Sequence, residues 1–292
     1  MTLPRDRVPY SAIVDRPPLV LPNKGRVAVW VIVNVEEWGI ERPMPRTVLS
    51  PPMGQPLLPD LPNWAWHEYG MRVGFWRIHA ALKRLGIVPT LAINGIVCKS
   101  YPRIARAALE AGWEFMGHAY VQGPMHKVED QRDAIRRTIG AIRDFTGKAP
   151  RGWESPGLTE TYDTIDILAE EGIEYVADWV LDDQPVEIAT KAGPVVSVPY
   201  TVETNDIPIM ALQHHGSEEM FRRGKDHFDQ LYEEGKSISR VMAISVHPYL
   251  SGVPHRIKYL EQLLEYVKGH DGAVLWTGEQ ILDWYKQARV AR

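Results

Sequence analysis

The sequence predicts an α/β protein built as a single parallel (β/α) barrel of seven or eight strands. Short apolar stretches of strand length alternate with helical stretches along the chain, and glycines mark most of the joints between them. Residues 29–35 are apolar apart from Asn34, which is typical of a strand buried on both faces of a parallel sheet. No linker separates two groups of elements, so the 292 residues are expected to form one barrel domain.

The predicted elements run from an N-terminal extended arm, residues 1–25, into the barrel, residues 26–292. The predicted strands are 26–35, 88–94, 113–117, 151–154, 174–177, 195–200, 241–246 and 273–276. The predicted helices are 71–85, 101–111, 129–146, 159–171, 217–234, 256–268 and 279–289. A Pro-rich loop, 38–69, separates the first strand from the first helix, and its length suits a cover over a site or a subunit contact.

The helices are predicted from the spacing of apolar residues and from the glycines that follow them. In 129–146, Ile135, Ile139 and Ile142 recur at intervals of four and three residues, which places them on one face. Gly147 follows at the position where a left-handed residue commonly ends a helix. Such helices alternating with buried strands are typical of right-handed parallel βαβ units.

Composition narrows the function classes. The net charge is -4 and the chain has no basic block, which argues against nucleic acid or an anionic membrane as a partner. No apolar run reaches the ~18 residues of a membrane span, and the single cysteine, Cys98, cannot form an internal disulfide. We therefore expect a cytoplasmic protein that acts on a small-molecule amide or a sugar.

Polar side chains follow nearly every predicted strand. These residues are Glu36, Glu37, Asn94, His118, Glu154, Asp178, Asn205, Asp206 and His247. The carboxyl ends of parallel barrel strands meet at one mouth, so carboxylates and imidazoles that are distant in sequence are expected to converge there. The sequence therefore predicts an active site at this end of the barrel.

Four motifs in order resemble those of the polysaccharide deacetylase superfamily. They are Asn34-Val35-Glu36-Glu37, Gly117-His118-Ala119-Tyr120-Val121-Gln122, Arg151-Gly152-Trp153-Glu154-Ser155-Pro156 and Ser245-Val246-His247-Pro248. The resemblance implies a distorted parallel (β/α) barrel. It also implies a first carboxylate that acts as the base, a second that binds a metal, and two metal-binding histidines four residues apart.

The second motif departs from that pattern in a way that bears on the metal. Gln122 stands where the superfamily has its second histidine, and an amide oxygen is a poor zinc ligand. The ligands, if a metal binds, are expected to be Glu37, His118 and His126, although Gly123-Pro124 should break a helix that would align His126. The expected cofactor is therefore either none or a weakly bound, zinc-like divalent metal.

The departures resemble a subgroup, the metal-independent bacterial allantoinases and related cyclic-amide hydrolases. The residues that carry this resemblance are Asn34-Val35-Glu36-Glu37, Gly74-Phe75-Trp76-Arg77, Arg151-Gly152-Trp153, Pro199-Tyr200 and Thr204-Asn205-Asp206. The stretch from His247 to Arg256 is also similar to intracellular peptidoglycan deacetylase-like proteins. Both groups form homo-oligomers, so the resemblance implies a dimer or tetramer.

The favoured function is hydrolysis of a non-peptide carbon–nitrogen bond in a small cyclic amide, imide or ureide. Glu36 or Glu37 is expected to act as the base on a water near His118, and a cationic His247 with backbone N–H groups is expected to stabilise the oxyanion. Arg151 either holds a carboxylate in place or takes part in catalysis. The residues expected to contact substrate are Trp38, Gln122, Trp153, Glu154, Asn205 and Asp206.

Two other functions remain open from the sequence. The first is metal-dependent N-deacetylation of an amino sugar or polysaccharide. The second is a catalytically decayed barrel that only binds a carbohydrate, but the joint presence of Glu36, Glu37, His118 and His247 argues against decay. The sequence does not identify the substrate, the pathway or which glutamate is the base.

Overall fold

The computed structural model describes residues 2–290, and its core is one curled sheet. The strands are β1 (Val27–Val35), β2 (Thr90–Ile93), β3 (Glu114–Gly117), β4 (Gly152–Trp153), β5 (Tyr175–Val176), β6 (Val186–Ile188), β7 (Val195–Ser197), β8 (Arg240–Val246) and β9 (Ala273–Leu275). Their order is β6-β7-β5-β4-β3-β2-β1-β8, with β9 paired to β1. All pairings are parallel except β6 with β7, and the sheet stays open between β6 and β8.

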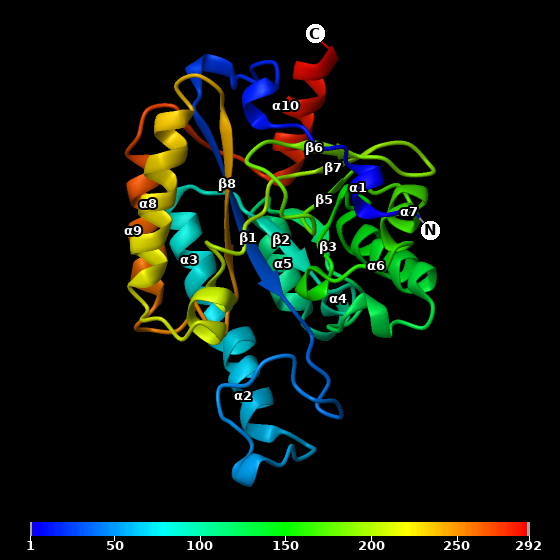
Figure 1. Cartoon of the computed structure of the whole chain (residues 1–292). Coiled ribbons are helices and arrows are strands. Elements are labelled where there is room, and N and C mark those ends of the chain that lie inside the picture. The colour runs from blue at the N-terminus through cyan, green and yellow to red at the C-terminus, as the bar shows by residue number, and fades with distance from the viewer. Residues whose placement is uncertain (1, 291–292) are drawn as a thin grey trace.

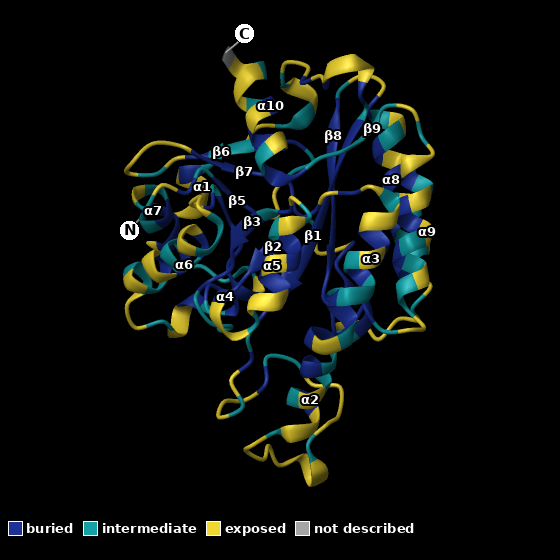
Figure 2. Cartoon of the chain, turned by 180° about the vertical axis from the view of Figure 1, so that it is seen from behind, coloured by how far each residue is buried: buried dark blue, intermediate teal, exposed yellow. Residues whose placement is uncertain are grey.

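Helices surround the sheet and bury it (Figure 1, Figure 2). They are α1 (Pro4–Arg7), α2 (Leu61–Tyr69), α3 (Phe75–Leu85), α4 (Val97–Ser100), α5 (Pro102–Glu110), α6 (Gln131–Thr146), α7 (Thr164–Glu170), α8 (Glu219–Glu234), α9 (Ile257–Lys268) and α10 (Gly278–Val290). Within residues 2–290, no helix combines the length and apolar character needed to cross a lipid bilayer.

Strand β1 is the centre of the fold. All nine of its residues are buried, and it pairs with β2, β8 and β9. Its one polar residue, Asn34, donates a hydrogen bond from Nδ2 to Ser245 Oγ on β8 (2.8 Å), which satisfies a buried donor without breaking the sheet. The buried run that predicted a two-sided parallel strand is therefore confirmed.

The predicted fold class, a single α/β barrel, is confirmed as a curled, mostly parallel half-barrel. The strand number differs, because the described chain has nine strands and includes the antiparallel β6. This three-residue strand is only partly buried and lacks the apolar run that marks the others. The boundary predicted at residue 25 stays a prediction.

The predicted loop 38–69 ends in a helix. Asp60 caps α2 by accepting a hydrogen bond from the Asn63 N–H (3.3 Å), and a π-helical segment, Gly70–Gly74, joins α2 to α3. The helical run therefore begins well before residue 71, where the sequence placed it. Residues 38–60 and α2 form a projection that leaves the barrel at the carboxyl end of β1 (Figure 1).

Two glycines let this helical run pack closely against the loop after β8. A Cβ atom on Gly74 would overlap the carbonyl group of Pro248, and one on Gly70 would overlap the backbone of Tyr249. Because Pro248 follows His247 directly, this close backbone contact positions a predicted site residue.

We therefore expect Gly74→Ala to lower the free energy of unfolding by about 1–3 kcal/mol, the usual cost of overpacking a rigid contact. The matched control is Gly140→Ala in α6, where the nearest heavy atom lies 4.0 Å from the added Cβ. That change should stabilise the protein by about 0.5–1 kcal/mol through helix propensity. Urea titrations measure both, and equal effects of the two variants would contradict the close contact.

Candidate active site

A buried carboxylate, Glu36, stands at the carboxyl end of β1 and is only 4% exposed. Its Oε1 accepts a hydrogen bond from Gln122 Nε2 (2.9 Å) and its Oε2 accepts one from Trp38 Nε1 (2.6 Å). His67 Nε2 donates to the backbone carbonyl of the same residue (2.9 Å). The carboxylate is therefore held in one orientation by neutral N–H donors.

Two imidazoles from other strands face this carboxylate. His118 Nε2 lies 3.7 Å and His247 Nε2 lies 3.5 Å from Glu36 Oε1. His118 Nδ1 donates to the carbonyl oxygen of Glu154 (2.7 Å), so its Nε2 points toward the carboxylate, and this buried atom has no hydrogen-bond partner. The carboxyl ends of β1, β3 and β8 thus bring one carboxylate and two imidazoles together, as the sequence predicted.

A second carboxylate fixes His247. Asp206 Oδ1 accepts from His247 Nδ1 (2.7 Å), and Asp206 Oδ2 accepts from the backbone N–H of His247 (2.7 Å) and from Ser251 Oγ (2.7 Å). Burial alone would lower the pKa of His247, but the charges of Asp206 and Glu36 outweigh it and raise the pKa to about 10. His247 is therefore cationic at neutral pH.

The same interactions act on the other two groups. Burial alone would raise the pKa of Glu36, but its interactions with His118 and His247 hold that pKa well below its usual range. Burial opposes the charged form of His118, and the neighbouring Glu36 and Glu154 nevertheless raise its pKa. Glu36 is thus ionised throughout the neutral range.

These residues line a cavity of about 840 Å³ at the barrel mouth. Its polar lining residues include Glu36, His118, Gln122, Glu154, Asn205 and His247. Glu154 is buried, its Oε2 has no hydrogen-bond partner, and burial raises the pKa of its carboxyl group to about 7. Residues 42–46 at the base of the projection form part of the wall.

The structure separates the two adjacent glutamates. Glu37 accepts a hydrogen bond from Ser100 Oγ (2.6 Å) and does not line the cavity, whereas Glu36 does. Successive residues of an extended chain point in opposite directions, so only one of the pair can face the mouth. The expectation that Glu37 shares the site is corrected, and Glu36 is the candidate base.

The two tryptophans expected to contact substrate are buried instead. Trp38 is 1% exposed and stacks on His67, with ring centroids 4.6 Å apart. Trp153 is fully buried and donates a hydrogen bond to Ser155 Oγ (2.9 Å). Trp38 therefore acts on the site through its bond to Glu36, and Trp153 is a core residue.

Arg151 lies away from the site, before the start of β4. Its guanidinium pairs with Glu174 (2.6 Å) at the start of β5 and with Asp283 (2.8 Å) on α10. In a parallel barrel the active-site residues follow the strands and do not precede them. The predicted catalytic role of Arg151 is therefore wrong, and the alternative role, holding carboxylates in place, remains. Asp206 was expected to contact substrate, but it holds His247 and does not line the cavity.

The residues do not fit the metal site that the resemblance suggested. His126 lies on a 3-10 turn, Met125–Lys127, and lines a different cavity from His118, while Glu37 faces Ser100. Both oxygens of Glu36 already accept N–H hydrogen bonds. Across the described part of the chain, no group of three or more His, Cys, Asp or Glu side chains is placed to hold a metal ion.

Sequence reasoning missed three residues of the site. His67 is buried and holds both Trp38 and the Glu36 carbonyl, and Tyr249 packs on Trp38 with ring centroids 5.0 Å apart. Ser251 donates to Asp206. The cluster Trp64-Ala65-Trp66-His67 was a visible signal, but nothing in the sequence connects it to the end of β1.

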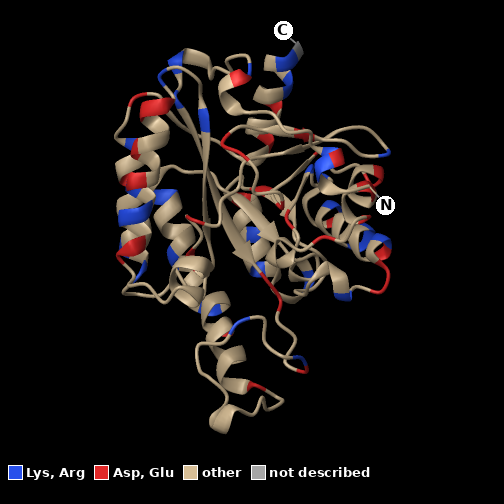
Figure 3. Ribbon diagram, viewed as in Figure 1, with Lys and Arg blue, Asp and Glu red and all other residues tan. Residues whose placement is uncertain are grey.

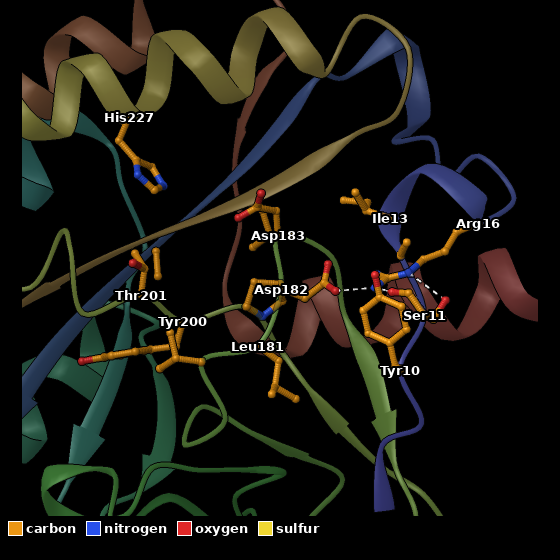
Figure 4. Close-up of a pocket in the computed structure, with 15 residues that line it drawn as sticks. Tyr10, Ser11, Ile13, Arg16, Leu181, Asp182, Asp183, Tyr200, Thr201 and His227 are labelled. Carbon is orange, nitrogen blue, oxygen red and sulfur yellow. Dashed lines mark hydrogen bonds and ion pairs between the residues drawn. The ribbon is translucent and has the colours of Figure 1, made fainter. Parts of the chain in front are cut away.

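A second cavity, of about 380 Å³, lies on the open side of the barrel. It is bordered by the N-terminal arm, by residues 180–183 and by β8 residues, and Arg16 of the arm pairs there with Asp182 (2.6 Å; Figure 4). None of Glu36, His118 and His247 lines it, so the barrel mouth remains the candidate site.

The family model for polysaccharide deacetylase matches residues 66–176. A putative polysaccharide deacetylase of Schizosaccharomyces pombe is 28% identical over 289 residues, covering 89% of this chain and 90% of that protein. Over most of its length the chain is therefore similar to a polysaccharide deacetylase. The peptidoglycan deacetylase of Helicobacter pylori is 23% identical, covering 72% of this chain and 83% of that protein.

Solved structures match nearly the whole chain. A probable polysaccharide deacetylase from Pseudomonas aeruginosa PAO1 has a TM-score of 0.84 and 29% identity, covering 94% of this chain and 95% of its own. PuuE allantoinase has a TM-score of 0.87 and 27% identity, covering 98% of both chains. The chain is therefore similar in structure both to a probable polysaccharide deacetylase and to an allantoinase, the two kinds of protein that its motifs resemble.

Replacing Asp206 by Asn should lower the pKa of His247 from about 10 toward its ordinary value near 6.5, because the largest attraction on the imidazolium is lost. In the wild type, the stabilisation from charged His247 is fully present below about pH 6.5 and is lost as the pH rises to about 10. An NMR titration of the imidazole measures the shift. Ser251→Ala, which removes a neutral donor from Asp206, is the control and should leave this pKa nearly unchanged.

Proposed function

We propose that this polysaccharide deacetylase-like protein is a hydrolase of non-peptide carbon–nitrogen bonds, with a small cyclic amide, imide or ureide as substrate. The observation that carries the proposal is the environment of Glu36. Gln122 and Trp38 hold its carboxylate by N–H donors, and a cationic His247 stands 3.5 Å away. This chain's own side chains therefore supply the base, Glu36, the cation, His247, and the cavity that they line. The similarity to PuuE allantoinase supports a cyclic ureide among the candidates.

The proposed reaction begins with a water held between Glu36 and His118. The water oxygen forms a bond to the substrate carbonyl carbon while the Glu36 carboxylate takes a proton from the water. The Nε2 atom of His118, which has no hydrogen-bond partner, orients the water for this step. His247 stabilises the oxyanion as an imidazolium. The carbon–nitrogen bond then breaks, and the nitrogen takes a proton from His247. Loss of the proton from Glu36 and recovery of one by His247 return the site to its starting state, so the net change is addition of one water.

N-deacetylation of an amino sugar is the second candidate function. The deacetylase names of the Schizosaccharomyces pombe and Helicobacter pylori relatives favour it, as does a cavity of about 840 Å³, which has room for a sugar ring. The two candidates share the water-activating carboxylate but differ in the need for a metal.

Replacement of Glu36 by Gln should lower kcat at least about 100-fold, because the base that accepts the water proton is lost. Glu37→Gln is the matched control, since Glu37 is bonded to Ser100 outside the cavity, and its kcat should stay within about threefold of the wild type. Circular dichroism checks that both variants are folded. A greater loss in Glu37→Gln than in Glu36→Gln would reverse the assignment of the base.

Hydrolysis of cyclic ureides and imides should survive prolonged treatment with a chelator, and elemental analysis should find well below one zinc-like ion per chain. Gln122→His restores an imidazole opposite Glu36 and should gain metal, which makes it the positive control for the analysis. A stoichiometric metal in the wild type, with activity restricted to N-acetylated sugars, would instead establish the deacetylase alternative.

A further inference from the structure

Three cationic side chains line the cavity at the barrel mouth, namely those of Arg42, Arg46 and Lys127. The two arginines lie in the segment that leaves β1 for the projection, where Figure 3 shows Lys and Arg in blue. Lys127 ends the 3-10 turn that follows β3. Within residues 2–290, none of the three forms an ion pair with a carboxylate. We call these residues the rim cations.

The carboxyl groups deeper in the cavity do not balance the rim cations. The charge of Glu36 is compensated by the imidazolium of His247, 3.5 Å away. Glu154 carries at most one negative charge, since burial raises the pKa of its carboxyl group to about 7. Three rim cations less one carboxylate leave an excess of at least two positive charges. A cleft lined by an excess of one sign of charge attracts ligands of the opposite sign.

Two donors on the cavity wall have no hydrogen-bond partner. Tyr249 lines the cavity and is only 2% exposed, and its hydroxyl group is buried and unpartnered. The Nε atom of Arg46 is also buried and unpartnered, while its Nη1 donates to the carbonyl of Pro45 (2.9 Å). Buried donors in folded proteins are normally satisfied, so these two indicate an acceptor supplied by a ligand.

Arg46 and Tyr249 act on the same part of the cavity. Burial raises the pKa of the Tyr249 hydroxyl well above its usual range, and the carboxylates nearby add to that rise. The positive charge of Arg46 opposes the rise, so the guanidinium is near enough to interact with the hydroxyl. The ring of Tyr249 also lies 5.5 Å from that of His247, measured between centroids. The two donors therefore border the reacting centre.

We propose that Arg46 and Tyr249 form a subsite for a carboxylate carried by the substrate, which is then an anionic cyclic amide, imide or ureide. A guanidinium and a hydroxyl together can donate to both oxygens of a carboxylate. A monoanion suits this subsite better than a phosphate dianion, because the ionised Glu36 lies in the same cavity. The inference rests on the proposed hydrolase function and specifies the substrate class.

The test compares two lactams that differ in one charge, pyroglutamate and pyroglutamamide. Isothermal titration calorimetry measures both dissociation constants on the full chain carrying Glu36→Gln, so that turnover does not interfere. The acid should bind at least about tenfold more tightly than the amide, because hydrogen bonds to a charged acceptor are the stronger ones. Adding Arg46→Gln should reduce this preference below about threefold, whereas Arg46→Lys keeps the charge and should retain part of it.

Tyr249→Phe tests the second donor, since it removes the hydroxyl and keeps the ring that packs on Trp38. It should weaken binding of the acid about tenfold and leave binding of the amide nearly unchanged. A merely structural role of Tyr249 would weaken both ligands alike and would remove it from the subsite.

Arg103→Gln is the matched control, because it removes the same charge from an exposed position on α5 outside the cavity. It should leave the preference for the acid unchanged, and circular dichroism checks that every variant is folded. Equal binding of the two lactams, or a preference that survives Arg46→Gln, would overturn the subsite while lactam binding still supports the hydrolase. Failure of the proposed function is a different result, in which neither lactam binds but N-acetylglucosamine does, and it would overturn the subsite as well.

Discussion

The burial of the Glu36 carboxylate is the constraint on which the rest of the site depends. Moving an ionised carboxylate out of water costs several kcal/mol unless hydrogen bonds and opposite charges replace the water. Here Trp38 and Gln122 supply the hydrogen bonds, and His247 supplies the positive charge. Each donor comes from a different segment, so the projection, the turn after β3 and the end of β8 must all be in place for this one charge to be stable.

That dependence explains why much of the fold was predictable and why parts of the site were not. The strands and the polar residues that follow them were visible because burial in a parallel sheet leaves an apolar run in the sequence, as in β1. Which of two adjacent glutamates faces the mouth depends on the direction in which the chain leaves β1, and that direction is set by tertiary contacts. The structural role of Arg151 depends on Asp283, more than a hundred residues later, which local patterning cannot connect to it.

Helix α2 also shows that local sequence patterns could not predict every element of the fold. Prolines throughout 38–69 predicted a loop, because proline disfavours helix interiors. Pro62 lies in the first turn of α2, where its missing N–H has no helical partner to lose, and Asp60 caps the helix. The same helix brings His67 against Trp38. A segment that appeared irregular in the sequence thus supplies the support for the donor on Glu36.

Gln122 stands where the resembled superfamily has a histidine. The charge balance around Glu36 gives this difference a physical meaning. A divalent ion beside Glu36 would stabilise the carboxylate and would repel a proton on His247. With an amide in that place, the carboxylate is stabilised by a neutral donor, and the positive charge resides on an imidazole whose pKa Asp206 and Glu36 together raise to about 10. Unlike a metal ion, an imidazolium can also deliver a proton to a departing nitrogen. Gln122 and Asp206 are therefore two parts of one arrangement: the first leaves room for a cationic His247, and the second keeps it charged.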